Sequence, residues 1–169
     1  MSRADEVVAA ARRVLERDGR DGLTMTAVAA ELGIRAPSLY KHVAGKAAIE
    51  VGLIDVALAE TGRALHDVLR RPGRRPPLVA LLAAYRRHAL AHPNLYRLAT
   101  SGTLPRPELT PGLEDWAGEP FLAVTGDAHR AQALWAFAHG MVILELDGRF
   151  PAGSDLDRTW ARGAAAFAS

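Results

Sequence analysis

A short stretch of the chain carries side chains that can bind a phosphate or read the edge of a base. Within five residues it supplies a hydroxyl, a phenol, an ammonium and an imidazole, from Ser38, Tyr40, Lys41 and His42. Leu39 and Val43 stand four residues apart, as expected of the inward side of a short helix over 36–43. The polar groups would then face solvent, and such a helix can enter the major groove of DNA. The alternative is an ordinary amphipathic helix with a solvated side.

The residues before this stretch predict a second helix that would hold it in place. Thr24 can cap that helix, because its hydroxyl can accept a hydrogen bond from a free backbone N–H of the first turn. Gly33 follows where a helix would end in a left-handed conformation. Pro37 lies in the first turn of the predicted helix over 36–43, where a missing backbone N–H costs nothing. Between the cap and the glycine, an apolar face at helical spacing is formed by Val28, Ala29 and Leu32. The pattern predicts a helix-turn-helix.

Two further helices would complete the helix-turn-helix domain and connect it to the rest of the chain. Because two short helices bury too little surface to stand alone, we expect the helix over 2–18, which opens on the capping pair Ser2 and Asp5, to pack behind them. Residues 1–45 then form a three-helix DNA-binding domain. A helical pattern over 46–69 follows and would be about 35 Å long, which suits a connection to the rest of the chain.

The remaining sequence predicts helices throughout. They span 78–92, 94–100, 112–125 and 128–147, with a last helix that begins at a capping signal formed by Ser154 and Asp157. No segment shows sustained alternation with β-branched residues, so the expected fold class is all-α. We expect residues 46–169 to form a helical-bundle domain that binds a ligand and pairs two copies of the chain.

Composition excludes several classes of protein. The chain has no cysteine, which removes disulfides, thiolate metal sites and cysteine nucleophiles and fits a reducing cytoplasm. Its N-terminus alternates charge and does not resemble a signal peptide. No apolar run approaches the roughly 18 residues of a membrane span. The net charge of +2 is too small to argue for nucleic-acid binding, although the only two lysines, Lys41 and Lys46, both fall in the candidate reader.

The order of cap, apolar face, glycine, first-turn proline, Leu-Tyr-x-His and lysine resembles the DNA-binding domain of the tetracycline-repressor (TetR) family, from Asp5 to about Asp55. A later segment resembles a C-terminal domain type of that family marked by Trp and His-Gly, here Trp135, His139 and Gly140. The resemblance implies a ligand-responsive transcription regulator, most often a repressor. It would bind a palindromic operator in double-stranded DNA as a homodimer and be released by a small-molecule inducer.

The resemblance also assigns roles in DNA binding. Ser38 would meet a base edge or a phosphate, Tyr40 and His42 would clamp the phosphate backbone, and Lys46 would contact a phosphate. The same set includes Thr24 and Thr26 near the backbone, Arg35 and Lys41 at base or phosphate, and Ala36 at a thymine methyl. For Tyr40 the alternative is packing within the chain. Arg35 and Ala36 depart from the family pattern, which leaves the operator sequence open.

Two further sets follow from the resemblance. The candidates for ligand contact are the aromatic or polar-tipped residues Tyr85, His88, Tyr96, Trp116, Phe121, Trp135 and His139, for which the alternative is ordinary core. The candidates for a dimer face are Leu134, Ala138, Val142, Trp160, Gly163, Ala164 and Phe167, for which the alternative is packing within one chain. His88 and His92 have a spacing that can bind a metal, but no partner acid stands at a fixed spacing. We therefore expect no metal and no cofactor.

Two other functions remain as alternatives. A DNA-binding architectural protein without a ligand would have the same head and a solidly packed body. A helical enzyme that binds a small molecule is less consistent with the sequence, because it contains no nucleophile elbow, no phosphate-binding loop and no dinucleotide fingerprint. We expect a protein that is not an enzyme.

Overall fold

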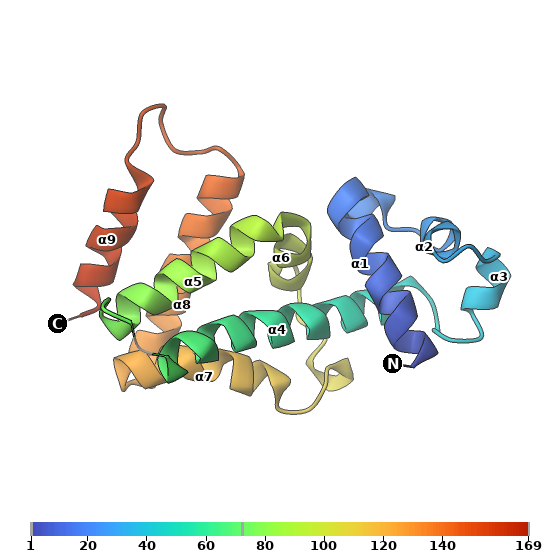
Figure 1. Ribbon diagram of the computed structural model, residues 1–169, viewed down its shortest axis with the longest axis horizontal. Coiled ribbons are helices and arrows are strands. Elements are labelled where there is room, and N and C mark those ends of the chain that lie inside the picture. The colour runs from blue at the N-terminus through green and yellow to red at the C-terminus, as the bar shows by residue number, and fades with distance from the viewer. Residues whose placement is uncertain (1, 72, 169) are drawn as a thin grey trace. The chain divides into compact units, whose positions relative to one another are not determined.

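The computed structural model describes residues 2–71 and 73–168, and within them it contains α-helices, one short 3₁₀ helix and no strand (Figure 1). The elements are α1 (Arg3–Gly22), α2 (Met25–Glu31), α3 (Ala36–Leu39), α4 (Lys46–Arg70), α5 (Pro77–Ala91), α6 (Pro93–Thr100), η1 (Arg106–Glu108), α7 (Leu113–Thr125), α8 (Ala128–Leu146) and α9 (Leu156–Ala166). The all-α prediction is confirmed. No helix within the described residues combines the length and the apolar character that a membrane crossing requires.

The chain divides into two compact units. Unit 1 comprises residues 1–58 and 92–113, and unit 2 comprises residues 59–91 and 114–169. The division by compactness falls inside α4, whereas the functional boundary expected from the sequence falls at its start. Unit 1 therefore holds more than the three predicted head helices, because it also contains α6 and the first half of α4.

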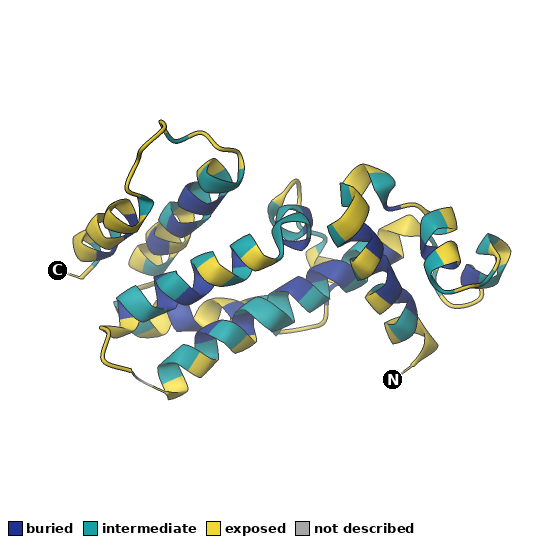
Figure 2. Ribbon diagram, turned by 45° about the horizontal axis from the view of Figure 1, so that its top comes forward, coloured by how far each residue is buried: buried dark blue, intermediate teal, exposed yellow. Residues whose placement is uncertain are grey.

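Unit 1 is built on one apolar cluster, to which α1 contributes five buried residues from its middle part (Figure 2). The buried side chains of α1 are Val7, Ala10, Ala11, Val14 and Leu15, and they pack with buried residues of α2, α3, α4 and α6. The predicted capping box is present, since the Ser2 hydroxyl accepts from the Asp5 N–H at 3.2 Å and the Asp5 carboxylate accepts from the Ser2 N–H at 2.6 Å. These local bonds fix the start of α1.

The helix-turn-helix follows the predicted signals up to its last turn. Thr24 Oγ1 accepts a hydrogen bond from the Ala27 N–H at 3.1 Å, and Gly33 turns the chain with a φ of 68°. The helix predicted over 36–43 is too long, because α3 ends at Leu39. Arg35 gives α3 no side-chain cap, and the chain after Leu39 closes in a tight turn in which the His42 N–H donates to the Leu39 carbonyl at 2.8 Å.

Glu16 of α1 joins α6 to unit 1. Its carboxylate accepts hydrogen bonds from the backbone N–H groups of Asn94 and Leu95 at 3.4 and 3.2 Å, and its carbonyl accepts from the Asn94 amide at 3.1 Å. A carboxylate at the first turn of a helix satisfies free donors and favours the positive end of the helix dipole. Because Leu95 and Leu98 also enter the apolar cluster, α6 is part of the same compact unit as α1.

Unit 2 is held by a partly buried charge network among α5, α8 and α9. Arg86 donates from Nε and Nη2 to the Glu145 carboxylate at 2.9 and 2.7 Å, and from Nη1 to Asp157 at 2.5 Å. The Trp160 indole N–H also donates to Glu145 at 3.3 Å. These hydrogen bonds, with Glu145 the largest cause, raise the pKa of Arg86 further above its ordinary value. The network fixes α8 and α9 relative to α5.

Two local details of unit 2 differ from what the sequence favours. The last helix is capped by Asp155, whose carboxylate accepts from the Arg158 N–H at 2.9 Å, and not by Ser154, whose hydroxyl donates to the Pro151 carbonyl. α7 runs through Gly118 and Pro120, two residue types that disfavour the interior of a helix. Neither detail alters which helices form.

Candidate nucleic-acid interface

All nine residues predicted to contact DNA lie in unit 1, and none of them is buried. Tyr40 has 60% of its surface exposed, so the alternative of packing within the chain does not describe it. The other exposed members are Thr24, Thr26, Arg35, Lys41, His42 and Lys46, while Ala36 and Ser38 are partly buried. The fold therefore leaves a set of hydroxyl, phenol, imidazole and cationic groups open to a ligand around α2, α3 and the start of α4.

Buried anchors position these exposed groups. Leu39, the last residue of α3, is fully buried, and Val28 and Ala29 of α2 lie in the same apolar cluster. Because the inward side chains hold the two helices, the outward ones are presented on a fixed backbone. Phosphate contacts of this kind set the register of a protein on DNA, and base-edge contacts then supply the specificity.

Arg13 and Arg17 of unit 1 already form ion pairs within the chain. The Glu31 carboxylate of α2 accepts from Arg13 at 2.7 Å and from Arg17 at 3.0 Å. The hydrogen bonds from Arg13 and then Arg17 hold the pKa of Glu31 below its ordinary value, so this carboxylate stays ionised. Arg17 also pairs with Asp18. These pairs join α1 to α2 and leave the predicted interface to other positive charges.

Lys46 has neighbours that were not predicted from the sequence. Its Nζ lies 3.4 Å from the Arg20 carbonyl and 3.9 Å from a Glu50 oxygen, and Glu50 also pairs with the Arg20 guanidinium. Glu50 stands four residues after Lys46 on α4, a spacing that predicts an ion pair and could have been recognised. Arg20 follows the kink at Gly19, where φ is 72°, and no pattern in the sequence places its side chain.

The seven residues predicted to contact a ligand are divided between the two compact units. Tyr96 belongs to unit 1 and the other six to unit 2. Tyr85 and Phe121 are buried and pack edge to face with ring centroids 5.7 Å apart. Trp116 stacks on His66 at 4.7 Å, and His66 Nε2 donates to the Trp116 carbonyl at 3.0 Å. His88 is partly buried on α5, while Trp135, exposed on α8, stacks on the partly buried His139.

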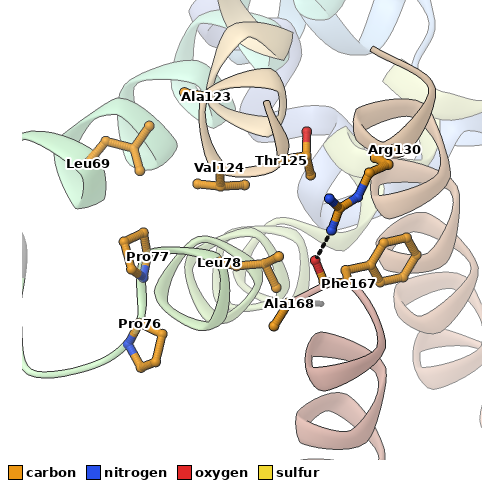
Figure 3. A pocket seen from close by; sticks show the side chains of 10 residues that line it. All are labelled: Leu69, Pro76, Pro77, Leu78, Ala123, Val124, Thr125, Arg130, Phe167 and Ala168. Atoms are coloured by element: carbon orange, nitrogen blue, oxygen red, sulfur yellow. Dashed lines mark hydrogen bonds between the residues drawn. The ribbon is translucent and has the colours of Figure 1, made fainter. Parts of the chain in front are cut away.

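Unit 2 instead has an open hollow of about 560 Å³ to which none of those seven residues contributes (Figure 3). It is lined by Leu69, Pro76, Pro77, Leu78, Ala123, Val124, Thr125, Arg130, Phe167 and Ala168. The lining is mostly apolar, and Arg130 brings the only charge among these ten residues while it donates to the Phe167 carbonyl at 2.7 Å. An apolar wall with few polar groups is typical of a small-molecule site.

The residues predicted for a dimer face need correction. Leu134, Ala138 and Val142 are fully buried within the chain itself, and Trp160 and Ala164 are nearly so. Gly163 packs against its own unit, since a Cβ on it would lie 2.0 Å from a ring atom of Phe137. Phe167 is partly buried, contacts Phe137 and lines the hollow. Buried side chains cannot contact a partner, so the dimer prediction is wrong for these five residues, whereas Gly163 and Phe167 keep some exposed surface.

No group of three or more His, Asp or Glu side chains in residues 2–71 and 73–168 is arranged to hold a metal ion.

Comparison with known proteins decides the family. Residues 7–49 match the model for bacterial regulatory proteins of the tetR family, and residues 78–167 match the model for a tetracyclin repressor-like C-terminal domain. The chain belongs to the TetR family of transcription regulators. It is a DNA-binding regulator of the helix-turn-helix type, as the resemblance implied.

Individual relatives agree with this assignment. The chain is 32% identical over 161 residues to an uncharacterised HTH-type transcriptional regulator of Mycobacterium tuberculosis, covering 85% of this chain and 70% of that protein. It is 36% identical over 116 residues to the HTH-type transcriptional repressor DrrR1 of Streptomyces coeruleorubidus, covering 65% of this chain and 40% of that repressor. The chain thus matches less than half of that repressor's length. The fold matches the crystal structure of a TetR variant from Acinetobacter baumannii in complex with minocycline, with a TM-score of 0.66 and 21% identity over 99% of this chain and 94% of that one.

Proposed function

We propose that this TetR-family regulator is a homodimeric, ligand-responsive repressor that binds a palindromic operator through residues 1–45 and is released by a small molecule. Residues 46–169 would bind the ligand and pair the two copies, and α4 would connect the two functions. The observation that carries the DNA-binding part is the exposure of seven of the eight polar or cationic candidates around α2, α3 and the start of α4; Ser38 is partly buried. No catalytic activity is part of the proposal.

Lys46 provides the sharpest test of the DNA interface. A lysine that binds a phosphate releases a counterion, so its loss lowers the slope of log affinity against log salt concentration by about 0.9. We expect Lys46→Ala to weaken binding to every duplex and to reduce the slope by about this amount. Tyr40→Phe should weaken binding without changing the slope, because the phenol carries no charge.

Fluorescence anisotropy with labelled duplexes at about 50 to 200 mM salt measures both quantities. Arg149→Ala is the matched control, because it removes one exposed positive charge from unit 2. If Lys46→Ala and Arg149→Ala change the slope equally, Lys46 has no specific phosphate contact and its assignment fails.

The outward side of α8 is the surface that best supports a dimer. Trp135 and Leu144 have 47% and 43% of their surfaces exposed, and Ala133 and Ala136 are also exposed. A Cβ on Gly140 would meet no atom of its own chain, so nothing within the chain requires a glycine there. A glycine inside a helix costs about 0.5–1 kcal/mol relative to alanine, and close approach of another helix would account for it. We therefore propose that a second copy of the chain packs on this side of α8.

We propose the hollow in unit 2 as the ligand site, and a ligand bound there would disfavour the architectural alternative. Its composition suits a small, largely apolar molecule with a hydrogen-bond acceptor near Arg130 or Thr125. The related fold that was solved with minocycline suggests that compound as a first probe. Ala123→Trp would fill the hollow from an exposed position and leave the apolar core intact. A probe that raises the melting temperature of the wild-type protein should lose this effect in Ala123→Trp, and an equal effect in both would place the ligand elsewhere.

A further inference from the structure

Arg20, Lys46 and Glu50 form one charged cluster beside the start of α4, within unit 1. The Arg20 guanidinium donates from Nε and Nη2 to the two Glu50 oxygens at 3.4 and 3.3 Å, and Lys46 Nζ lies 3.9 Å from the nearer of them. Lys46 also donates to the Arg20 carbonyl at 3.4 Å. One carboxylate therefore serves two cations at the position where the DNA interface is proposed.

This cluster differs from the structural ion pair of unit 2. The Arg86–Glu145 bonds measure 2.7 and 2.9 Å, and only 21% and 14% of those side chains are exposed. The contacts of Arg20 with Glu50 are about half an ångström longer, and the Arg20 and Lys46 side chains are 55% and 44% exposed. Long contacts made by exposed cations are weak, and the cations can exchange the carboxylate for another anion. The geometry suits a replaceable partner.

The exposed fractions also separate the roles within the cluster. Glu50 is the least exposed member, with 20% of its side chain accessible, whereas both cations reach solvent. A phosphate approaching from outside would therefore meet Arg20 and Lys46 before it met the carboxylate. The net charge of the three side chains is +1, so an incoming phosphate is attracted, but less strongly than by the two cations alone.

We propose that Arg20 is a further phosphate-binding residue of this regulator, and that Glu50 is an internal anion which a DNA phosphate replaces. The proposal rests on the DNA-binding function proposed above and adds two residues to it. In the free protein, Glu50 holds both cations and lowers their attraction for DNA. On DNA, the two cations would contact phosphate, and Glu50 would reduce the affinity for every sequence alike, because phosphates carry no sequence information.

The test compares Glu50→Gln with Glu31→Gln in the full-length protein. Glu31 is a matched control, since it also pairs with two arginines in unit 1 and has 21% of its side chain exposed. Anisotropy titrations on two unrelated duplexes should show that Glu50→Gln tightens binding to both by about two- to fivefold. Glu31→Gln should leave the affinity unchanged. Equal tightening by the two variants would reflect bulk charge alone and would overturn the proposal.

Arg20→Ala tests the proposed phosphate contact of Arg20. It should weaken binding to both duplexes and reduce the salt slope by about 0.9, like Lys46→Ala. An unchanged slope in Arg20→Ala overturns its role as a phosphate contact. If Glu50→Gln does not fold, as judged by circular dichroism, the slope of Arg20→Ala decides the proposal by itself.

The outcomes also separate this proposal from the DNA-binding function. If the wild-type protein binds no duplex, or if Lys46→Ala has no effect, the DNA interface itself is wrong. If the wild type binds and Lys46→Ala reduces the slope while the Arg20 and Glu50 variants behave as wild type, only the cluster proposal fails.

Discussion

The two compact units leave opposite kinds of surface uncovered. In unit 1 the apolar cluster is closed, and the one large hydrophobic residue exposed among its described residues is Tyr40, which ends in a phenol. In unit 2 the exposed large hydrophobic residues are Leu122, Trp135 and Leu144, and the hollow is also mostly apolar. Exposed cations and hydroxyls favour phosphate, whereas an exposed apolar patch favours another protein or a small molecule. This difference agrees with the proposal that unit 1 contacts DNA and that unit 2 contacts a second copy of the chain and a small molecule.

The glycines inside the helices can also be compared between the two units, by what a Cβ at each position would meet. A Cβ on Gly52 of unit 1 would meet Val8, and a Cβ on Gly62 or Gly163 of unit 2 would meet Trp116 or Phe137 of the same unit. These glycines are explained by close packing within each unit. A Cβ on Gly140 of α8, like one on Gly118 of α7, would meet no atom within 4 Å. Gly140 lies four residues from the exposed Ala136 and Leu144, on the side of α8 where we propose that a second copy of the chain packs.

The largest effect is expected from Trp135→Glu. The exposed indole would sit at the centre of the proposed dimer face, where a truncated aromatic anchor typically costs about 2–4 kcal/mol, and a buried charge adds a further penalty. Sedimentation equilibrium should show a dissociation constant raised at least about thirtyfold, with the helical circular dichroism spectrum unchanged. Leu122→Glu introduces the same charge at an exposed residue of α7 and serves as control. Equal dissociation by both variants, or by neither, would remove the outward side of α8 as the dimer face.

An intermediate effect is expected from the glycines of unit 2. Gly163→Ala would place a Cβ 2.0 Å from the Phe137 ring, so the ring or the helices must shift, and overpacking of this kind costs about 1–3 kcal/mol of unfolding free energy. Gly140→Ala has no such clash and should weaken the dimer instead. Urea unfolding and sedimentation measure the two quantities separately. If Gly163→Ala unfolds like wild type, the packing described for α9 against Phe137 is wrong.

The smallest effect is expected from His139. Burial lowers its pKa below the ordinary value of 6.5, so the unfolded chain takes up a proton at a higher pH than the folded one. The stability from the neutral ring is complete above about pH 6.5 and declines as the pH falls through 6.5 toward the lowered pKa. The melting temperature should therefore drop less between about pH 7.5 and 5.5 in His139→Gln than in wild type. His129→Gln, at an exposed position of the same helix, should behave as wild type. If the melting temperature of His139→Gln drops as much as that of the wild type, burial of His139 has no effect on the pH dependence.

The parts of the fold that depend on neighbouring residues could be predicted from the sequence. Ser2 with Asp5, Thr24 and Gly33 act within three or four residues, and each has the predicted cap or turn. The outward position of Tyr40, Lys41 and His42 was also predicted, although α3 ends before them. Contacts between distant residues could not be predicted: Glu16 binds α6 across 78 residues, and Arg86 binds Glu145 across 59. No local pattern encodes either pair.

The residues predicted for the dimer face show a second limit of prediction from sequence. α8 carries apolar residues on every side, from the buried Leu134 and Val142 to the exposed Trp135 and Leu144. Periodicity identifies an inward side only when the other side is polar, so it could not distinguish the two sides of this helix. The family resemblance suggested a dimer face on the last two helices, but most of the side chains chosen for it are buried in the interior of unit 2. Burial within a single chain was needed to separate core from surface.

The central claim is that two copies of unit 1 bind DNA as a symmetric pair. The most direct test is to select duplexes bound by the full-length protein from a random pool and to sequence them. We expect enrichment of an inverted repeat whose half-site centres lie about 10–10.5 base pairs apart, one turn of DNA, or a multiple of it. Enrichment of single, unrepeated sites, or no enrichment at all, would contradict the claim.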